Sequence, residues 1–238
     1  MKIIGVSMRM SKASDYDESR DVIAHDWCSL LEPLNVLPVM IPNNLSNIVQ
    51  YLNRIEISHL LLTGGESVGN EEQLLSFFER SAELESLPKK LSDYTKLSIR
   101  DITEVICLRY ALQNKLPVFA VCRGLQLINA CFGGKLSREQ FVRNNEINDA
   151  GGAEHISTVH PVEWVETSES FYVNSYHADA VYESQIATAL NCLALSNDGV
   201  VEALQNKEHK ITSVQWHPER EKIKCPLSER LIEAWLNS

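Results

Sequence analysis

Residues 117–126 have the sequence Pro-Val-Phe-Ala-Val-Cys-Arg-Gly-Leu-Gln, in which an apolar run ends at a cysteine and a helix-like segment begins at once. The first five residues are typical of a buried strand, and the segment from Arg123 to Phe132 is typical of a helix. Small residues, Ala120 and Gly124, lie two positions before and two positions after Cys122. A tight strand-to-helix turn needs small neighbours because the backbone folds back on itself. The stretch therefore predicts either a nucleophilic thiol at the carboxyl edge of a parallel sheet or a buried structural cysteine.

A cysteine in this position would lie at the N-terminus of the helix. The partial positive charge of a helix N-terminus favours thiolate over thiol, and thiol pKa values in such places can fall to about 3.5–7.5. The backbone N–H groups of the first turn also point at any oxyanion that develops on a substrate carbonyl. Both effects suit attack by Cys122 on an amide.

Around this stretch, strand-like and helix-like segments alternate through the first half of the chain, which predicts an α/β fold with a mostly parallel sheet flanked by helices. Residues 66–98 break the alternation with a polar, charged surface excursion that holds one helix near Glu71–Leu84. The second half predicts short antiparallel ribbons flanking the main sheet, followed by a closing helix from Pro226 to about Leu236. The predicted strands are Lys2–Ser7, Val36–Ile41, His59–Thr63, Pro117–Val121, Ile156–Val165, Ser170–Asn174, Cys192–Ser196, Val200–Gln205 and Ile211–Gln215, and the other predicted helices are Ser19–Leu31, Leu45–Arg54, Ile99–Gln113 and Arg123–Phe132.

The composition is that of an ordinary globular protein, with 238 residues of which 44% are hydrophobic and 23% charged. We expect one domain that spans residues 1–238. The net charge of −10 argues against a broad nucleic-acid surface, which needs clustered Lys and Arg. The apolar runs are shorter than the roughly 18 residues of a membrane span, and the apolar start of the chain is too short for a signal peptide.

The cysteines lie at positions 28, 107, 122, 131, 192 and 225 and form no C-x-x-C pair. This scatter favours reduced thiols in a cytoplasmic protein over a disulfide framework or a zinc site. We therefore expect no metal.

A second strand-like segment ends in a histidine, a proline and a glutamate: residues 211–219 are Ile-Thr-Ser-Val-Gln-Trp-His-Pro-Glu. Pro218 fixes the chain after His217, so that Glu219 can turn back toward the imidazole. A carboxylate that accepts one ring N–H leaves the other ring nitrogen able to take a thiol proton. The chain has seven histidines, and the alternative for His217 is a packed or surface side chain.

A third strand-like segment ends in two glycines, in Thr63-Gly64-Gly65. Glycines let the backbone approach a ligand without an intervening Cβ, and a free N–H here could pair with that of Arg123 as an oxyanion hole. The alternative is a simple turn.

Taken together, Thr-Gly-Gly, Cys-Arg-Gly-x-Gln and His-Pro-Glu, in this order and each at a strand end, resemble the class I glutamine amidotransferase superfamily. The Cys-Arg-Gly form is most similar to the γ-glutamyl hydrolase branch, peptidase family C26. Ala120 and Glu66 depart from the pattern, because the family more often has glycine and aspartate there. Further similar segments extend the resemblance over essentially the whole chain, namely Arg100-Asp101-x-x-Glu104, Phe132-Gly133-Gly134, Val173-Asn174-Ser175-Tyr176-His177 and Asp198-Gly199-Val200-Val201-Glu202-Ala203.

The resemblance implies a flavodoxin-like fold and a Cys122–His217–Glu219 triad without a cofactor. It implies oxyanion donors from the backbone of Gly65 and Arg123. For Arg100, Asp101 and Glu104, structural ion pairing at a helix start is favoured over substrate contact, and His177 is either a pocket residue or a packed neighbour. The other residues implied to lie near a bound glutamyl group are Gly64, Gln126 and Ser175, with His177 as the fourth.

The reaction implied by the resemblance is hydrolysis of a small-molecule γ-glutamyl amide through a γ-glutamyl thioester. The alternatives are a glutaminase subunit that supplies ammonia to a synthetase partner and a non-catalytic binding relative. Substrates in the family include γ-glutamyl-aminobutyrate and folate polyglutamates, and the overall resemblance favours a γ-glutamyl nucleotide amidate such as the γ-glutamyl-CDP-amidate of capsule biosynthesis. No motif identifies a nucleotide site, and solvated surface charge explains the basic residues Arg9, Lys12, Arg20 and Arg143.

Overall fold

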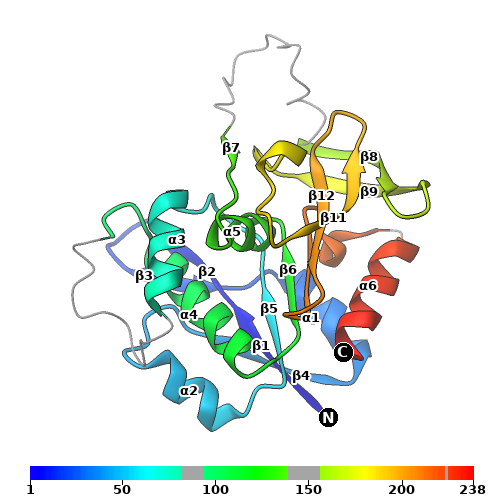
Figure 1. Cartoon of the computed structure of the whole chain (residues 1–238). Helices are drawn as coiled ribbons and strands as arrows, with labels where there is room; N and C mark the ends of the chain where they lie inside the picture. The colour runs from blue at the N-terminus through cyan, green and yellow to red at the C-terminus, as the bar shows by residue number, and fades with distance from the viewer. Residues whose placement is uncertain (82–93, 139–155, 223–224) are drawn as a thin grey trace.

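A computed structural model describes residues 1–81, 94–138, 156–222 and 225–238. Its main sheet has nine strands: β1 Lys2–Ser7, β4 Val36–Ile41, β5 His59–Leu62, β6 Val118–Val121, β8 Ile156–Trp164, β9 Glu169–Tyr176, β11 Asn191–Ser196, β12 Val201–Asn206 and β13 Ile211–Val214. They are ordered β4-β1-β5-β6-β13-β12-β11-β8-β9 (Figure 1). Neighbours from β4 to β13 are parallel, and neighbours from β13 to β9 are antiparallel. The predicted α/β class is confirmed, but the antiparallel strands continue the main sheet and are not separate ribbons beside it.

Helices cover both faces of this sheet (Figure 1), because successive side chains of its central strands point to opposite sides. Leu60 and Leu62 of β5 enter one hydrophobic core, and Leu61 enters the other. The first core includes residues of α2 to α5, whereas the second includes Trp27 of α1 and Trp235 of α6. The six α-helices of the described residues are α1 His25–Leu31, α2 Ile48–Ile55, α3 Glu71–Arg80, α4 Ile99–Gln113, α5 Arg123–Cys131 and α6 Pro226–Leu236.

The predicted helix Ser19–Leu31 is wrong in its first part. Ser19–Val22 is strand β3, which pairs antiparallel with β2, Arg9–Lys12. The Asp21 carboxylate explains the difference, because it accepts hydrogen bonds from the Asn43 backbone N–H at 2.9 Å and from the Asn43 side-chain amide at 2.7 Å. The helix itself begins only at His25.

Other helix boundaries follow from capping. The predicted helix Leu45–Arg54 begins instead at Ile48, because the Asn47 side chain accepts a hydrogen bond from the Gln50 N–H at 2.8 Å. Helix α3 begins at Glu71 as predicted, and residues 82–84 of that prediction lie outside the described residues, as does Arg143. Two short strands not predicted from sequence, β7 Ser137–Arg138 and β10 Asp179–Ala180, pair with each other.

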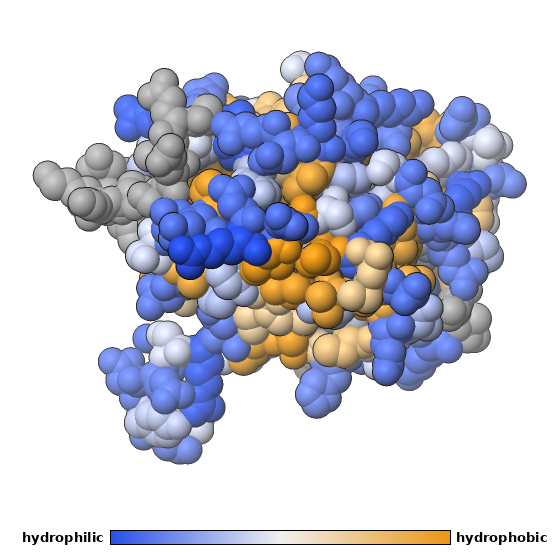
Figure 2. Space-filling model, turned by 90° about the horizontal axis from the view of Figure 1, so that it is seen from below, coloured by the Kyte–Doolittle hydropathy of each residue, from blue (hydrophilic) through white to orange (hydrophobic). Residues whose placement is uncertain are grey.

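The two ends of the parallel strands differ in character. Figure 2 shows the end at which these strands begin, where apolar side chains gather in the middle of a largely hydrophilic face. The segments singled out from sequence lie at the opposite end, after β5, β6 and β13. Within the described residues, no helix has the length and apolar character needed to cross a membrane.

Candidate active site

Cys122 lies between β6 and α5 in a backbone conformation that L-residues rarely adopt, with φ 52° and ψ −104°. Its N–H donates to the Val214 carbonyl of β13 at 2.7 Å, which holds the turn in place. A Cβ on Gly124 would lie 3.0 Å from the Ala120 Cβ and 2.9 Å from the Leu62 carbonyl oxygen. The tight strand-to-helix turn predicted from sequence is therefore present, and crowding explains its small residues.

His217 follows β13, and its ring is fixed by a carboxylate. The distance between His217 Nδ1 and Glu219 Oε1 is 2.6 Å, and both side chains are buried. The Asn174 side chain holds the backbone of His217 on both sides, because its Oδ1 accepts from the His217 N–H at 2.9 Å and its Nδ2 donates to the His217 carbonyl at 2.8 Å. The ring of Tyr176 stands edge-on to the imidazole, with centroids 5.6 Å apart.

Cys122 and His217 hydrogen-bond to each other, and each shifts the pKa of the other. Burial acts to raise the pKa of the Cys122 thiol, but the hydrogen bond to His217 and the charges of His217 and His177 outweigh it and lower the pKa below its usual value. Burial acts to lower the pKa of His217, but hydrogen bonds to Cys122 and Glu219 raise it to about 9. Both shifts favour the charged forms of the pair, a thiolate beside an imidazolium.

Gly64 lies against both of these side chains. A Cβ on Gly64 would be 2.6 Å from His217 Cε1 and 3.4 Å from Cys122 Cβ, so that only glycine fits here without displacing the imidazole. A Cβ on the next residue, Gly65, would collide with the guanidinium of Arg100. The two glycines therefore bring the backbone after β5 into contact with the thiol–imidazole pair.

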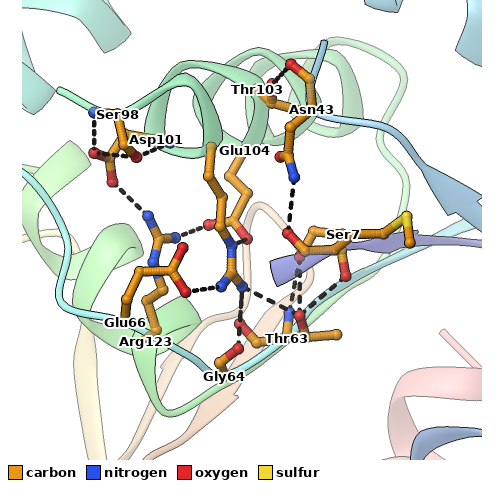
Figure 3. Close-up of polar contacts among 12 residues, drawn as sticks. Ser7, Asn43, Thr63, Gly64, Glu66, Ser98, Asp101, Thr103, Glu104 and Arg123 are labelled. Atoms are coloured by element: carbon orange, nitrogen blue, oxygen red, sulfur yellow. Dashed lines mark hydrogen bonds and ion pairs between the residues drawn. The ribbon is translucent and has the colours of Figure 1, made fainter. Parts of the chain in front are cut away.

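Behind the glycines, buried charged side chains join the strand end to α4 and α5 (Figure 3). Arg100 donates to the Thr63 carbonyl at 2.7 Å, to the Gly64 carbonyl at 3.1 Å and to Glu104 Oε1 at 2.8 Å. The side chain of Arg123 pairs with Asp101 and with the other oxygen of Glu104. These contacts support structural ion pairing by Arg100, Asp101 and Glu104.

A second group of buried polar side chains includes His177, whose charge acts on Cys122. His177 Nε2 is 3.6 Å from Oε1 of the buried Glu202, and His160 Nε2 is 3.5 Å from the same oxygen. Burial acts to lower the pKa of His177, but the nearby Glu202 carboxylate raises it overall. The positive charge of His177 in turn helps to lower the pKa of the Cys122 thiol. Among the residues that the structure describes, no group of three or more His, Cys, Asp or Glu side chains is arranged to hold a metal ion.

The predicted site residues thus differ in how they are placed. The thiol, the imidazole and its carboxylate, Gly64 and His177 come together at one edge of the sheet. The Arg123 side chain turns into the ion pairs, which leaves only its backbone beside Cys122. Gln126 and Ser175 are buried. The Gln126 amide donates to the Asp179 carbonyl at 2.9 Å, and the same carbonyl oxygen lies 3.1 Å from His177 Nδ1.

Two residues of this site had no role in the sequence prediction, although both lie in segments that resemble the family. Asn174 precedes Ser175, and its part in holding His217 depends on a contact between residues 43 positions apart. Glu202 is the charged residue of the otherwise apolar strand segment Val-Val-Glu-Ala-Leu. A lone carboxylate within such a run is a signal of a buried, paired charge.

Residues 2–219 match the family model described as Peptidase C26. The chain belongs to the peptidase C26 family. It is 26% identical over 222 residues to the gamma-glutamyl-CDP-amidate hydrolase of Campylobacter jejuni. The aligned region covers 92% of this chain and 90% of that protein. It is also 29% identical over 154 residues to the gamma-glutamyl-gamma-aminobutyrate hydrolase PuuD of Escherichia coli. That aligned region covers 58% of this chain and 60% of that protein. Membership of the peptidase C26 family and these two relatives support a hydrolase.

The fold is also found among solved structures. A glutamine amidotransferase of Thermotoga maritima superposes with a TM-score of 0.53 and 13% identity, over 99% of this chain and 81% of that one. The family resemblance inferred from the three strand-end segments is therefore confirmed.

Proposed function

We propose that the protein hydrolyses a γ-glutamyl amide, with Cys122 as nucleophile, His217 as general base and acid, and Glu219 as the carboxylate that orients His217. One observation carries this proposal. Cys122 occupies a strained turn at a helix N-terminus and hydrogen-bonds to His217, whose other ring nitrogen lies 2.6 Å from Glu219. Covalent amide hydrolysis requires a nucleophile that contacts a base and a base that contacts an orienting group.

In the proposed reaction, the thiolate of Cys122 attacks the γ-carbonyl carbon and forms a C–S bond. The backbone N–H groups of Gly65 and Arg123 donate to the oxyanion, and donors of this kind contribute roughly 10²–10³ in rate. The C–N bond then breaks, and the departing nitrogen takes its proton from His217. Water, losing a proton to His217, attacks the thioester and releases glutamate and the free thiol.

The proposed substrate is a γ-glutamyl nucleotide amidate, which would be cleaved to glutamate and a nucleotide amidate. Support comes from the likeness to gamma-glutamyl-CDP-amidate hydrolase, which extends over 92% of this chain. The likeness to the γ-aminobutyrate conjugate hydrolase covers a smaller share, 58% of the chain. The lower coverage makes a small aliphatic amine the second choice of leaving group.

The test is glutamate release from glutamine, γ-glutamyl-aminobutyrate, γ-glutamyl-CDP-amidate and a folate polyglutamate. Wild type is compared with Cys122→Ala and with Cys28→Ala, which removes an exposed thiol on α1 as a matched control. We expect turnover of the nucleotide amidate, with glutamine a poor substrate, and loss of that turnover in Cys122→Ala alone. Turnover of glutamine only would favour an ammonia-supplying subunit. Absence of turnover, or activity that survives Cys122→Ala, would rule out the proposed mechanism.

A further inference from the structure

A cleft of about 780 Å³ opens beside the candidate active site, between β9 and the chain that leads into α6. Its lining includes Asn174 and Tyr176, the two β9 residues that contact His217. In the proposed mechanism His217 gives a proton to the departing nitrogen. The leaving group therefore begins on the His217 side of the thiol, where Tyr176 connects the imidazole to this cleft.

The lining of the cleft offers aromatic ring surface to water. Tyr172 and Tyr176 lie two strand residues either side of Asn174 and so share one face of β9, with 69% and 40% of their surface exposed. Val159, which pairs with Asn174 from β8, lies on the same face and is 66% exposed. Exposed aromatic residues gathered along a cleft are suited to stacking against a planar ring.

The cleft also holds positive charge, although the chain as a whole carries −10. Arg220 and Lys222 line it, and the guanidinium of Arg220 lies 5.0 Å from the ring centroid of Tyr176. The intervening Glu221 directs its carboxylate to α6, where it accepts from the Cys225 N–H at 2.9 Å and from the Ser228 hydroxyl. The Glu221 carboxyl is thus committed to the helix start. Arg220 Nε lies 3.5 Å from Glu219 Oε1, so the exposed Lys222 is the cation that remains for an anionic ligand, with Arg220 beside it.

We propose that this cleft binds the leaving group and that the leaving group is a nucleotide, with its base against Tyr172 and its phosphates toward Arg220 and Lys222. The inference rests on the proposed function, because the cleft is reached from the side on which His217 protonates the departing nitrogen. It goes further by assigning residues to the nucleotide. Aromatic stacking and cations within one cleft are the two elements that nucleotide binding combines.

The test uses the double variant Tyr172→Ala/Lys222→Ala, which leaves the thiol, the imidazole and their direct contacts intact. Lys207→Ala, an exposed lysine in the turn after β12, is the charge-matched control. We expect the double variant to raise KM for γ-glutamyl-CDP-amidate about tenfold, because stacking alone contributes at least about fivefold per base. The kcat/KM for γ-glutamyl-aminobutyrate should stay at the wild-type value, as should both constants in Lys207→Ala.

A binding measurement separates the cleft from the chemistry. Calorimetric titration with cytidine 5′-diphosphate should show binding to wild type and to Cys122→Ala, and a Kd about tenfold higher in the double variant. If wild type cleaves γ-glutamyl amides but does not bind the nucleotide, or if the double variant binds it as well as wild type, the inference is overturned while the proposed function stands. If the nucleotide binds in the cleft but no γ-glutamyl compound is cleaved, the proposed function fails and the nucleotide site remains.

Discussion

Two buried groups of charged side chains lie near Cys122, and they differ in how firmly their charge is fixed. The arginine cluster, formed by Arg100, Asp101, Glu104 and Arg123, belongs to the helices that cover the parallel strands. The histidine cluster, formed by His160, His177 and Glu202, belongs to the antiparallel strands, and its Nε2–Oε1 distances are longer, at 3.5 and 3.6 Å. Guanidinium groups remain charged at any physiological pH, whereas imidazoles titrate near neutrality. The arginine cluster thus keeps its charge across physiological pH, whereas the charge that the histidine cluster places near the thiol, that of His177, is expected to depend on pH.

The largest expected effect comes from breaking the arginine cluster with Glu104→Ala. Glu104 is fully buried and pairs with both Arg100 and Arg123. Its removal leaves two buried guanidinium groups with less compensation, which should lower the free energy of unfolding by about 3–5 kcal/mol in urea titrations. The matched control is Glu66→Ala, because Glu66 pairs with the same Arg100 at 2.9 Å but its side chain is 40% exposed. That variant should lose less than about 1 kcal/mol; equal losses in the two variants would contradict the structural role of the arginine cluster.

The second expected effect is a pH-dependent loss of stability in Glu202→Gln. Burial acts to lower the pKa of His177, but Glu202 raises it above the ordinary value of 6.5. A raised pKa contributes stability that is fully present below 6.5 and is lost as pH rises through the pKa of the folded protein. The variant should therefore be less stable than wild type by about 1.5–3 kcal/mol at pH 5–6, with a smaller difference at higher pH. Unfolding titrations across this range measure it, and a difference that grows with pH would refute the assignment.

The same comparison applies to the reactivity of the thiol. The hydrogen bond to His217 leads the causes that lower the pKa of Cys122, and the charge of His177 adds to it. In His217→Ala, alkylation of Cys122 by iodoacetamide at pH 6 should slow, because the thiol pKa rises and each unit of rise lowers the thiolate fraction about tenfold. Glu202→Gln should slow the alkylation of Cys122 less than His217→Ala does. Cys107 and Cys131 serve as internal references in peptide mapping, because burial raises the pKa of both thiols. Equal labelling of Cys122 and these two cysteines in the wild-type protein would contradict the prediction.

The contrast between the clusters also separates what the sequence predicts from what it leaves open. The strand ends at Thr63, Cys122 and His217 were predictable, because apolar runs, glycines and helix starts are local signals. Strand β3 was not, since Ser-Arg-Asp-Val becomes a strand through pairing with β2 and through an Asp21–Asn43 contact across 22 residues. The histidine cluster was not predictable either, because its members lie on or after β8, β9 and β12, whose neighbours in the sheet only the folded chain defines.

The smallest expected effect concerns Asn174, which connects the antiparallel strands to His217 without any charge. Its two hydrogen bonds, 2.9 and 2.8 Å long, hold the backbone of His217. Asn174→Ala should lower the free energy of unfolding by about 1 kcal/mol, because net hydrogen bonds of this kind are weak. No titrating group takes part, so the loss should be the same at pH 5 and pH 8, unlike that of Glu202→Gln. If the Asn174→Ala loss followed the pH profile of Glu202→Gln, the sensitivity to pH would belong to the whole antiparallel region and not to the histidine cluster.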